Sequence, residues 1–305
     1  MATALGRRRR SAFAAVIATM AMALGFTAIP ADAAASPRID YVALGDSYTA
    51  GTGAGAAVRP DGVDCWQSHP GYVDVVGKTS RMKPVANAAC HGAVLSTSSP
   101  FYDPLIYTPT IEQQLAGLVG KGRLSAKTEL VSITAGANDL GFSWVLGACS
   151  ISTEACEGAL SQATSASSLQ ALQAALVQTY AAIHAAAPNA RIAVLGYPLL
   201  FDPASNFAPI PVTNQLLMNQ ATLALNALIA GAVAGANTLY EANAIYIDVT
   251  ARFTGHQVNS ADPWLVLDLA APTADYNFHP NRAGHALGYA AALLGAVEPA
   301  QLART

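Results

Sequence analysis

Charged residues are scarce in this chain of 305 residues: they make up 11% of it, against 52% for hydrophobic residues. The one run of basic residues is Arg7 to Arg10, and no basic patch follows it in the sequence. Proteins that bind nucleic acid or an anionic membrane surface carry such patches, so we expect neither as a partner. The apolar majority is large enough to bury the core of one domain of about 270 residues.

The common cofactor and metal motifs are also missing. No G-x-G-x-x-G follows a predicted strand, and the glycine-rich segment Gly51 to Gly55 lacks the lysine of a phosphate-binding loop. There is no C-x-x-C pair, and no histidine is spaced from a second ligand as a zinc site requires. We therefore expect no cofactor and no metal. The chain has neither an internal repeat nor an interdomain linker.

The first 33 residues have the features of a cleaved export signal. The basic run precedes an apolar stretch, Ser11 to Ile29, and Ala31-Asp32-Ala33 fits an A-x-A cleavage site. No basic stop-transfer flank follows, which argues against a membrane anchor; both Sec and twin-arginine export stay open. Cleavage would remove four arginines and one aspartate, leaving 12 of the 16 basic and 18 of the 19 acidic residues. We predict a secreted protein whose residues 34–305 form a single domain.

Four cysteines, Cys65, Cys90, Cys149 and Cys156, all lie beyond this signal. An even number in an exported chain favours disulfides over free thiols. Three pairings are possible. The sequential one closes the shortest loops, so we predict Cys65–Cys90 and Cys149–Cys156, with residues 149–156 forming a loop closed by the second bond.

Apolar, β-prone segments alternate with helical patterns along the chain. Strands are expected at 40–45, 83–89, 130–135, 191–196 and 244–249, and helices near 72–76, 111–119, 168–187, 214–233 and 283–296. This alternation is typical of an α/β protein with right-handed crossovers and helices on both faces of a parallel sheet. We expect a three-layer α/β/α sandwich with a five-stranded parallel sheet in the flavodoxin-like order 2-1-3-4-5.

Three polar or glycine-rich turns follow the first three strands. Ser47 comes directly after the first strand, Gly92 after the second and Asn138 after the third. In the expected strand order these turns meet at the crevice between strands 1 and 3, where open α/β sheets bind ligands. Each turn could merely cap a helix or supply a positive φ. Their convergence nevertheless predicts a functional site.

Four motifs occur in a fixed order: Gly45-Asp46-Ser47-Tyr48, Cys90-His91-Gly92-Ala93, Gly136-Ala137-Asn138-Asp139 and His279-Pro280. Together they resemble the four blocks of the SGNH (GDSL) hydrolase superfamily, and more narrowly its secreted actinobacterial esterases, lipases and phospholipases. The resemblance covers the chain beyond the export signal. Tyr48 is a departure, because the family's name has leucine at that position.

The resemblance implies an SGNH-hydrolase fold and a catalytic role for each motif. Ser47 would be the nucleophile and His279 its base, since an alcohol attacks poorly unless a base takes its proton and the unperturbed imidazole pKa is roughly 6.5. The main-chain N–H groups of Ser47 and Gly92 and the side-chain amide of Asn138 would form the oxyanion hole. His91 is expected to line the pocket.

A second departure concerns the group that orients His279. Many family members have an aspartate three residues before the histidine, where this chain has Tyr276. Some secreted actinobacterial relatives use a backbone carbonyl instead, so the resemblance implies the Tyr276 carbonyl as the acceptor. Asp275 is the alternative. Adjacent residues of an extended segment point to opposite sides, so we expect Asp275 to be dispensable.

Three functions fit these residues. We prefer a monomeric, metal-independent ester hydrolase that acts on small-molecule or lipid acyl esters. A carbohydrate or peptidoglycan O-acetylesterase would use the same residues. A non-catalytic binding protein on this fold is disfavoured because all four motifs are intact. Apolar residues of 201–211 and 264–267 are the expected acyl pocket or lid.

Overall fold

The computed structural model of the protein describes residues 38–298, except 61–63, 80, 107, 206 and 208. The predicted export signal, residues 1–33, lies outside the described residues.

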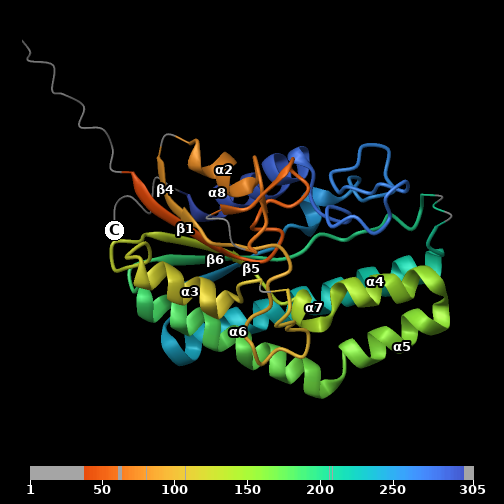
Figure 1. Ribbon diagram of the computed structural model, residues 1–305, viewed down its shortest axis with the longest axis horizontal. Helices are drawn as coiled ribbons and strands as arrows, with labels where there is room; N and C mark the ends of the chain where they lie inside the picture. Colours follow the sequence, from red (N-terminus) through yellow and green to blue (C-terminus); the bar gives the residue numbers. More distant parts are fainter. Residues whose placement is uncertain are drawn as a thin grey trace, which may run out of the picture. The chain divides into compact units, whose positions relative to one another are not determined.

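A five-stranded parallel sheet forms the centre of the domain (Figure 1). Its strands are β1 (Ile39–Gly45), β4 (Met82–Asn87), β5 (Leu130–Thr134), β6 (Arg191–Leu195) and β7 (Ala244–Ile247). Their spatial order is β4-β1-β5-β6-β7, and every neighbouring pair is parallel, which confirms the predicted order. The three inner strands are almost wholly buried, as expected when helices cover both faces of a parallel sheet.

Three helices pack on one face of this sheet: α3 (Ile111–Gly120), α6 (Ala166–Ala186) and α7 (Val212–Tyr240). The helix α7 runs seven residues beyond its predicted end at 233. Its last turns are held because the Asn237 side chain makes two hydrogen bonds of 2.8 Å with the backbone of Ala244 in β7. This helix is the one described helix long and apolar enough to cross a membrane. Here Ile229, Ala232 and Ala236 are fully buried in the domain core.

The opposite face is covered by α2 (Tyr72–Gly77), η4 (Gly284–Ala290) and α8 (Ala291–Val297). The predicted final helix, 283–296, is therefore present, but its first half is a π-helix. It places His285 in the core, where Nε2 lies 3.0 Å from the Thr52 carbonyl oxygen. A two-stranded antiparallel sheet, β2 (Ala57–Val58) and β3 (Gln67–Ser68), was not predicted.

The prediction of a loop at 149–156 was wrong. This segment is a corner between two helices, α4 (Phe142–Ile151) and α5 (Thr153–Ala163). Ser152 alone separates them: its backbone is extended, and its side chain caps α5 by accepting the Ala155 N–H. The Cys149–Cys156 disulfide joins the last turn of α4 to the first turn of α5. Both disulfides have the predicted pairing.

Candidate active site

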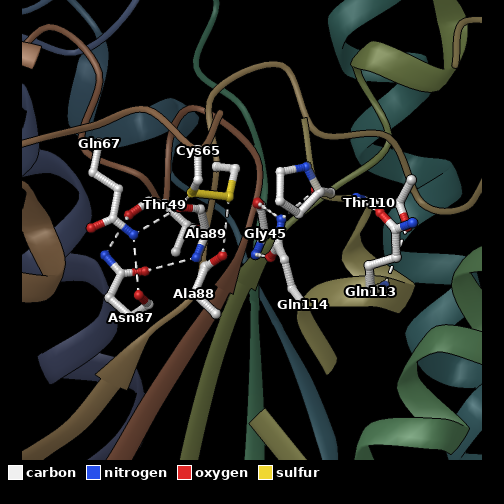
Figure 2. The surroundings of a disulfide bond; sticks show 12 residues. Gly45, Thr49, Cys65, Gln67, Asn87, Ala88, Ala89, Thr110, Gln113 and Gln114 are labelled. Atoms are coloured by element: carbon white, nitrogen blue, oxygen red, sulfur yellow. Dashed lines mark hydrogen bonds between the residues drawn. A yellow bond between two sulfur atoms is a disulfide. The ribbon is translucent and has the colours of Figure 1, made fainter. Parts of the chain in front are cut away.

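The turn that carries Ser47 begins at Gly45, the last residue of β1. Gly45 has φ +140°, and a Cβ there would lie 2.5 Å from the Thr134 carbonyl oxygen, so only glycine fits. The buried amide of Gln114 in α3 accepts the Gly45 N–H at 2.8 Å and donates to the Gly45 carbonyl at 3.0 Å. Figure 2 shows this pairing beside the disulfide. The strand end before Ser47 is thus held by a helix as well as by its neighbouring strands.

Asp46 ties the same turn to two other strands. Its buried carboxylate accepts the Tyr48 N–H at 3.0 Å, the Thr134 hydroxyl at 2.6 Å and the Tyr197 hydroxyl. Thr134 ends β5, and Tyr197 follows β6. Burial raises the pKa of the Asp46 carboxyl group. Asp46 therefore fixes the turn in place through these hydrogen bonds, and Ser47 lines the adjoining cavity.

The structure brings His279 to Ser47. Its Nε2 lies 2.7 Å from the Ser47 Oγ, and its Nδ1 lies 2.9 Å from the main-chain carbonyl oxygen of Asn277. A carbonyl can only accept a hydrogen bond, so Nδ1 carries the hydrogen and Nε2 is left to accept from the Ser47 hydroxyl. This is the tautomer that a base acting on Ser47 requires.

The expected acceptor, the Tyr276 carbonyl, was the wrong residue: the Nδ1 hydrogen bond goes to Asn277. The Tyr276 carbonyl instead accepts the backbone N–H of His279 at 3.3 Å. The physical reason is the backbone of Phe278, whose φ of +61° turns the chain so that the carbonyl two residues before the histidine faces the ring. Asp275 is exposed and makes no hydrogen bond to His279.

The Asn277 carbonyl is held in place by its own side chain. That side chain accepts the Asp268 N–H at 2.7 Å and donates to the Ala271 carbonyl at 2.7 Å. Asn277 is 6% exposed. The irregular segment before His279 is thereby closed on itself, which fixes the direction of the carbonyl.

Burial, followed by the neighbouring His91 imidazole, lowers the pKa of His279 to about 3. The imidazole is therefore neutral, and able to accept a proton, throughout the neutral range. The ring of His91 lies 5.3 Å from that of His279, and its Nδ1 is 3.1 Å from the Thr52 hydroxyl. Burial lowers the pKa of His91 as well. His91 lines the cavity, as expected.

Gly92 and Asn138 lie against the same cavity as Ser47. Gly92 has φ +77°, a conformation that glycine adopts readily. The Asn138 amide donates one hydrogen to the Ala93 carbonyl at 2.9 Å, which leaves its second N–H to the cavity. Within the described residues, the main-chain N–H groups of Ser47 and Gly92 donate to no protein acceptor. Ser47, Gly92 and Asn138 therefore line one cavity, and each has an N–H group without a protein acceptor among the described residues.

Two further links hold the Gly92 loop. The Cys65–Cys90 disulfide joins it to the chain beside β3, where the Gln67 amide donates to the Ala89 carbonyl at 2.9 Å (Figure 2). On the other side, the Asp139 carboxylate accepts the Leu95 N–H at 3.1 Å. Burial raises the pKa of Asp139 to about 6. The donors at 92 and 138 are therefore positioned by links on both sides.

The central cavity has a volume of about 80 Å³, and two of the spaces that share lining residues with it bear on the substrate. One is an apolar pocket of about 60 Å³ that shares Ala137, Phe142, Thr222 and Leu225 with it. The rest of this pocket is lined by residues of η2 (Asn138–Leu140), α4, α5 and α7, among them Leu140, Val145, Leu160 and Met218. The sequence does not predict this pocket, because these side chains meet only through helix packing.

The other space is a wider cleft of about 540 Å³ whose lining also includes His279. Phe207, Pro209, Ile210 and Leu267 line it, so parts of both predicted pocket segments do face a cavity. Phe201 and Trp264 do not: Phe201 is fully buried, and Trp264 stacks at 3.7 Å on the ring of His256.

The described part of the chain contains no group of three or more His, Cys, Asp or Glu side chains that could hold a metal ion.

Comparison with known proteins agrees with this geometry. The model of the GDSL-like lipase/acylhydrolase family matches residues 43–287. The chain belongs to this family. It is a carboxylic ester hydrolase with the α/β fold of SGNH lipases.

Family members from Streptomyces are similar along most of the chain. A lipase of Streptomyces rimosus is 32% identical over 288 residues, which cover 92% of this chain and 96% of the relative. The crystal structure of an extracellular lipase from Streptomyces rimosus matches with a TM-score of 0.68 and 28% identity, covering 85% of this chain and 100% of that one. A phospholipase A1 from Streptomyces albidoflavus NA297 matches with a TM-score of 0.67 and 29% identity, covering 84% and 98%.

Proposed function

We propose that this protein is a secreted serine hydrolase that cleaves the acyl esters of lipids through an acyl-enzyme on Ser47. The observation that carries the proposal is the Ser47–His279 pair. The Ser47 Oγ lies 2.7 Å from Nε2 of an imidazole whose other nitrogen is held at 2.9 Å by the Asn277 carbonyl. If Ser47 only capped a helix and His279 were only a structural core residue, neither would need to be placed in this way.

The reaction follows from this geometry. The Ser47 oxygen attacks the ester carbonyl carbon while its proton passes to His279 Nε2. The negative oxygen of the tetrahedral intermediate is stabilised by the N–H groups of Ser47, Gly92 and Asn138, each of which typically contributes on the order of 3 kcal/mol. The carbon–oxygen bond to the alcohol then breaks, and His279 returns the proton to that alcohol. A water molecule, deprotonated by the same imidazole, releases the acid and restores Ser47.

The apolar pocket favours a substrate whose acyl chain is longer than acetyl. It adjoins the central cavity, with which it shares Ala137 and Phe142, and is lined mainly by aliphatic side chains. A fatty-acyl chain would bury apolar surface there, at roughly 0.8 kcal/mol per methylene group. An acetyl group would leave it empty. The named activities of the Streptomyces relatives, lipase and phospholipase A1, point the same way.

Export is part of the proposal. It is supported by the features of residues 1–33, by two disulfides in the folded domain and by the relative named as an extracellular lipase.

Ser47→Ala tests the mechanism, and a panel of esters tests the substrate class. Ser47→Ala should fold normally and lose at least about 10³-fold in kcat. On nitrophenyl esters, kcat/KM of the wild type should rise from acetyl to medium-length chains, and phosphatidylcholine should be cleaved in preference to acetylated xylan. Activity of the folded Ser47→Ala variant would refute the serine mechanism. A preference for acetyl esters and acetylated xylan would instead favour an O-acetylesterase.

A further inference from the structure

Tyr48, the residue after Ser47, is hydrogen-bonded to Phe278, the residue before His279. Its hydroxyl donates to the main-chain carbonyl of Phe278 at 2.8 Å. This single hydrogen bond therefore spans 230 positions of sequence and joins the turn of the nucleophile to the segment of the base.

The carbonyl that Tyr48 holds belongs to a residue in an unfavourable conformation. Phe278 has φ +61°, a backbone conformation that residues other than glycine rarely adopt. Its N–H is fixed by the Val266 carbonyl at 2.7 Å, and its carbonyl is fixed by Tyr48. Because a peptide unit is planar, the direction of the Phe278 carbonyl also sets the direction of the His279 N–H in the same peptide. Without the Tyr48 bond, this peptide would keep only the longer hydrogen bond of 3.3 Å from the His279 N–H to the Tyr276 carbonyl.

The ring of Tyr48 is itself tightly surrounded. Its centroid lies 5.2 Å from the His279 ring, 5.2 Å from the perpendicular ring of Tyr197 and 5.7 Å from the ring of Tyr289. Tyr48 is 5% exposed. Burial, followed by the Asp46 charge, raises the pKa of the Tyr48 hydroxyl well above its usual value, so the group keeps its proton and stays a donor. Leucine, which gives the family's motif its last letter, has no hydroxyl to make this bond.

We propose that Tyr48 is a positioning residue for the base: its hydroxyl holds the Phe278 carbonyl and thereby keeps His279 Nε2 within hydrogen-bonding distance of the Ser47 oxygen. Tyr48 acts through His279, and the inference rests on the proposed function of that residue and of Ser47. Its loss should lower the rate of proton transfer more than it lowers substrate affinity.

The test compares two variants that each remove one buried hydroxyl, Tyr48→Phe and Tyr289→Phe. Tyr289 is a matched control, because it belongs to the same ring cluster and its hydroxyl donates to a main-chain carbonyl, that of Gly196, at the same distance of 2.8 Å. Both variants should lose similar thermal stability. Tyr48→Phe should lose at least about tenfold in kcat with KM within about twofold, since small misplacements of a catalytic group are costly. Tyr289→Phe should keep kcat within about twofold.

A second readout is the rate at which a fluorophosphonate labels Ser47, which depends on the same proton transfer and should fall in parallel with kcat in Tyr48→Phe. A folded Tyr48→Phe with near-normal kcat, or equal losses in both variants, would overturn the inference. If Tyr48→Phe does not fold, Tyr48→Leu replaces it with the same expectations, and failure of both to fold would show a structural role only. Ser47→Ala separates the two proposals: its activity would refute the serine mechanism, whereas an inactive Ser47→Ala beside a normal Tyr48→Phe refutes the positioning role alone.

Discussion

Replacing Gln114 with alanine should destabilise the protein and disturb the Ser47 turn. Gln114 is 5% exposed, and its amide makes three hydrogen bonds: two with the backbone of Gly45 and one to the Pro109 carbonyl at 3.2 Å. In the variant the Gly45 carbonyl keeps the Cys90 N–H, at 3.1 Å. The buried Gly45 N–H loses the acceptor that Gln114 supplied. The end of β1, two residues before Ser47, would then be left with an unpaired donor.

The size of the effect follows from these contacts. An unsatisfied buried donor costs about 1–3 kcal/mol, and the lost bond to Pro109 adds about 1 kcal/mol, so we expect a loss of roughly 2–4 kcal/mol in the free energy of unfolding. The midpoint temperature should fall by roughly 5–10 °C. Gln113→Ala is the matched control on the same helix. Gln113 is exposed and caps α3 by accepting the Thr110 N–H at 2.9 Å, a contact whose loss should cost about 1 kcal/mol or less (Figure 2).

Urea unfolding, followed by circular dichroism, measures the stability of both variants. The rate of ester hydrolysis reports whether the Ser47 turn is disturbed. Gln114→Glu adds a finer test, because a carboxylate can still accept the Gly45 N–H but cannot donate to the Gly45 carbonyl. Because the buried carboxylate would also face the Gly45 and Pro109 carbonyl oxygens, this variant should cost at least as much stability as Gln114→Ala. If Gln114→Ala cost no more than Gln113→Ala, the pairing with Gly45 would not contribute to stability and the reasoning would fail.

Three other outcomes are expected. Asp275→Asn should lower kcat by less than about tenfold, or ~1.4 kcal/mol, whereas a loss near 10⁴-fold in the folded variant would make Asp275 the partner of His279. Burial lowers the pKa of His285 to about 4, below the unfolded value of about 6.5, so the unfolded state binds the extra proton as the pH falls through this window. The wild type should therefore lose about 1.4 kcal/mol of stability per pH unit relative to His285→Gln between about pH 6.5 and 4, and parallel urea titration curves across that range would contradict this. Removing the disulfide that spans 25 residues should cost about 1 kcal/mol more than removing the one that spans seven, and equal costs in denaturant titrations would contradict the loop-closure argument.

The meeting of Ser47, Gly92 and Asn138 was predictable because each lies in the turn that follows a parallel strand. Once the alternation of strands and helices indicated the strand order, the three turns had to lie at one edge of the sheet. No long-range detail of packing was needed. The disulfide pairing was accessible for a similar reason, since short loops are the easiest to close.

The acceptor for His279 could not be predicted in the same way. It depends on one dihedral angle, the φ of +61° at Phe278, and phenylalanine carries no local signal for that conformation. The angle is held by partners far away in sequence, namely the Tyr48 hydroxyl and the Val266 carbonyl. A shift of one residue in the acceptor is therefore a tertiary effect.

The apolar pocket was missed for a different reason. Two cysteines seven positions apart predict a closed loop at 149–156 and give no sign of a corner between two helices. No helix was predicted between residues 119 and 168, so nothing indicated that Val145 and Leu160 would line one cavity with Met218. Only the Ser152 cap, between two helical stretches, was available as a sequence signal.

The hydrogen bonds that orient His279 also affect how a positive charge on its ring is stabilised. The groups that raise its pKa are main-chain carbonyls, those of Asn277 and Tyr276, and they do not offset burial and the two neighbouring imidazoles. A carboxylate at position 276 would raise the pKa by its negative charge; a carbonyl offers only a dipole. In the proposed mechanism, the imidazolium of His279 must then be stabilised by groups that are already in position. This gives the bonds that fix the Asn277 and Phe278 carbonyls, from the Asn277 side chain and from Tyr48, a larger share in catalysis than they would have beside a charged partner.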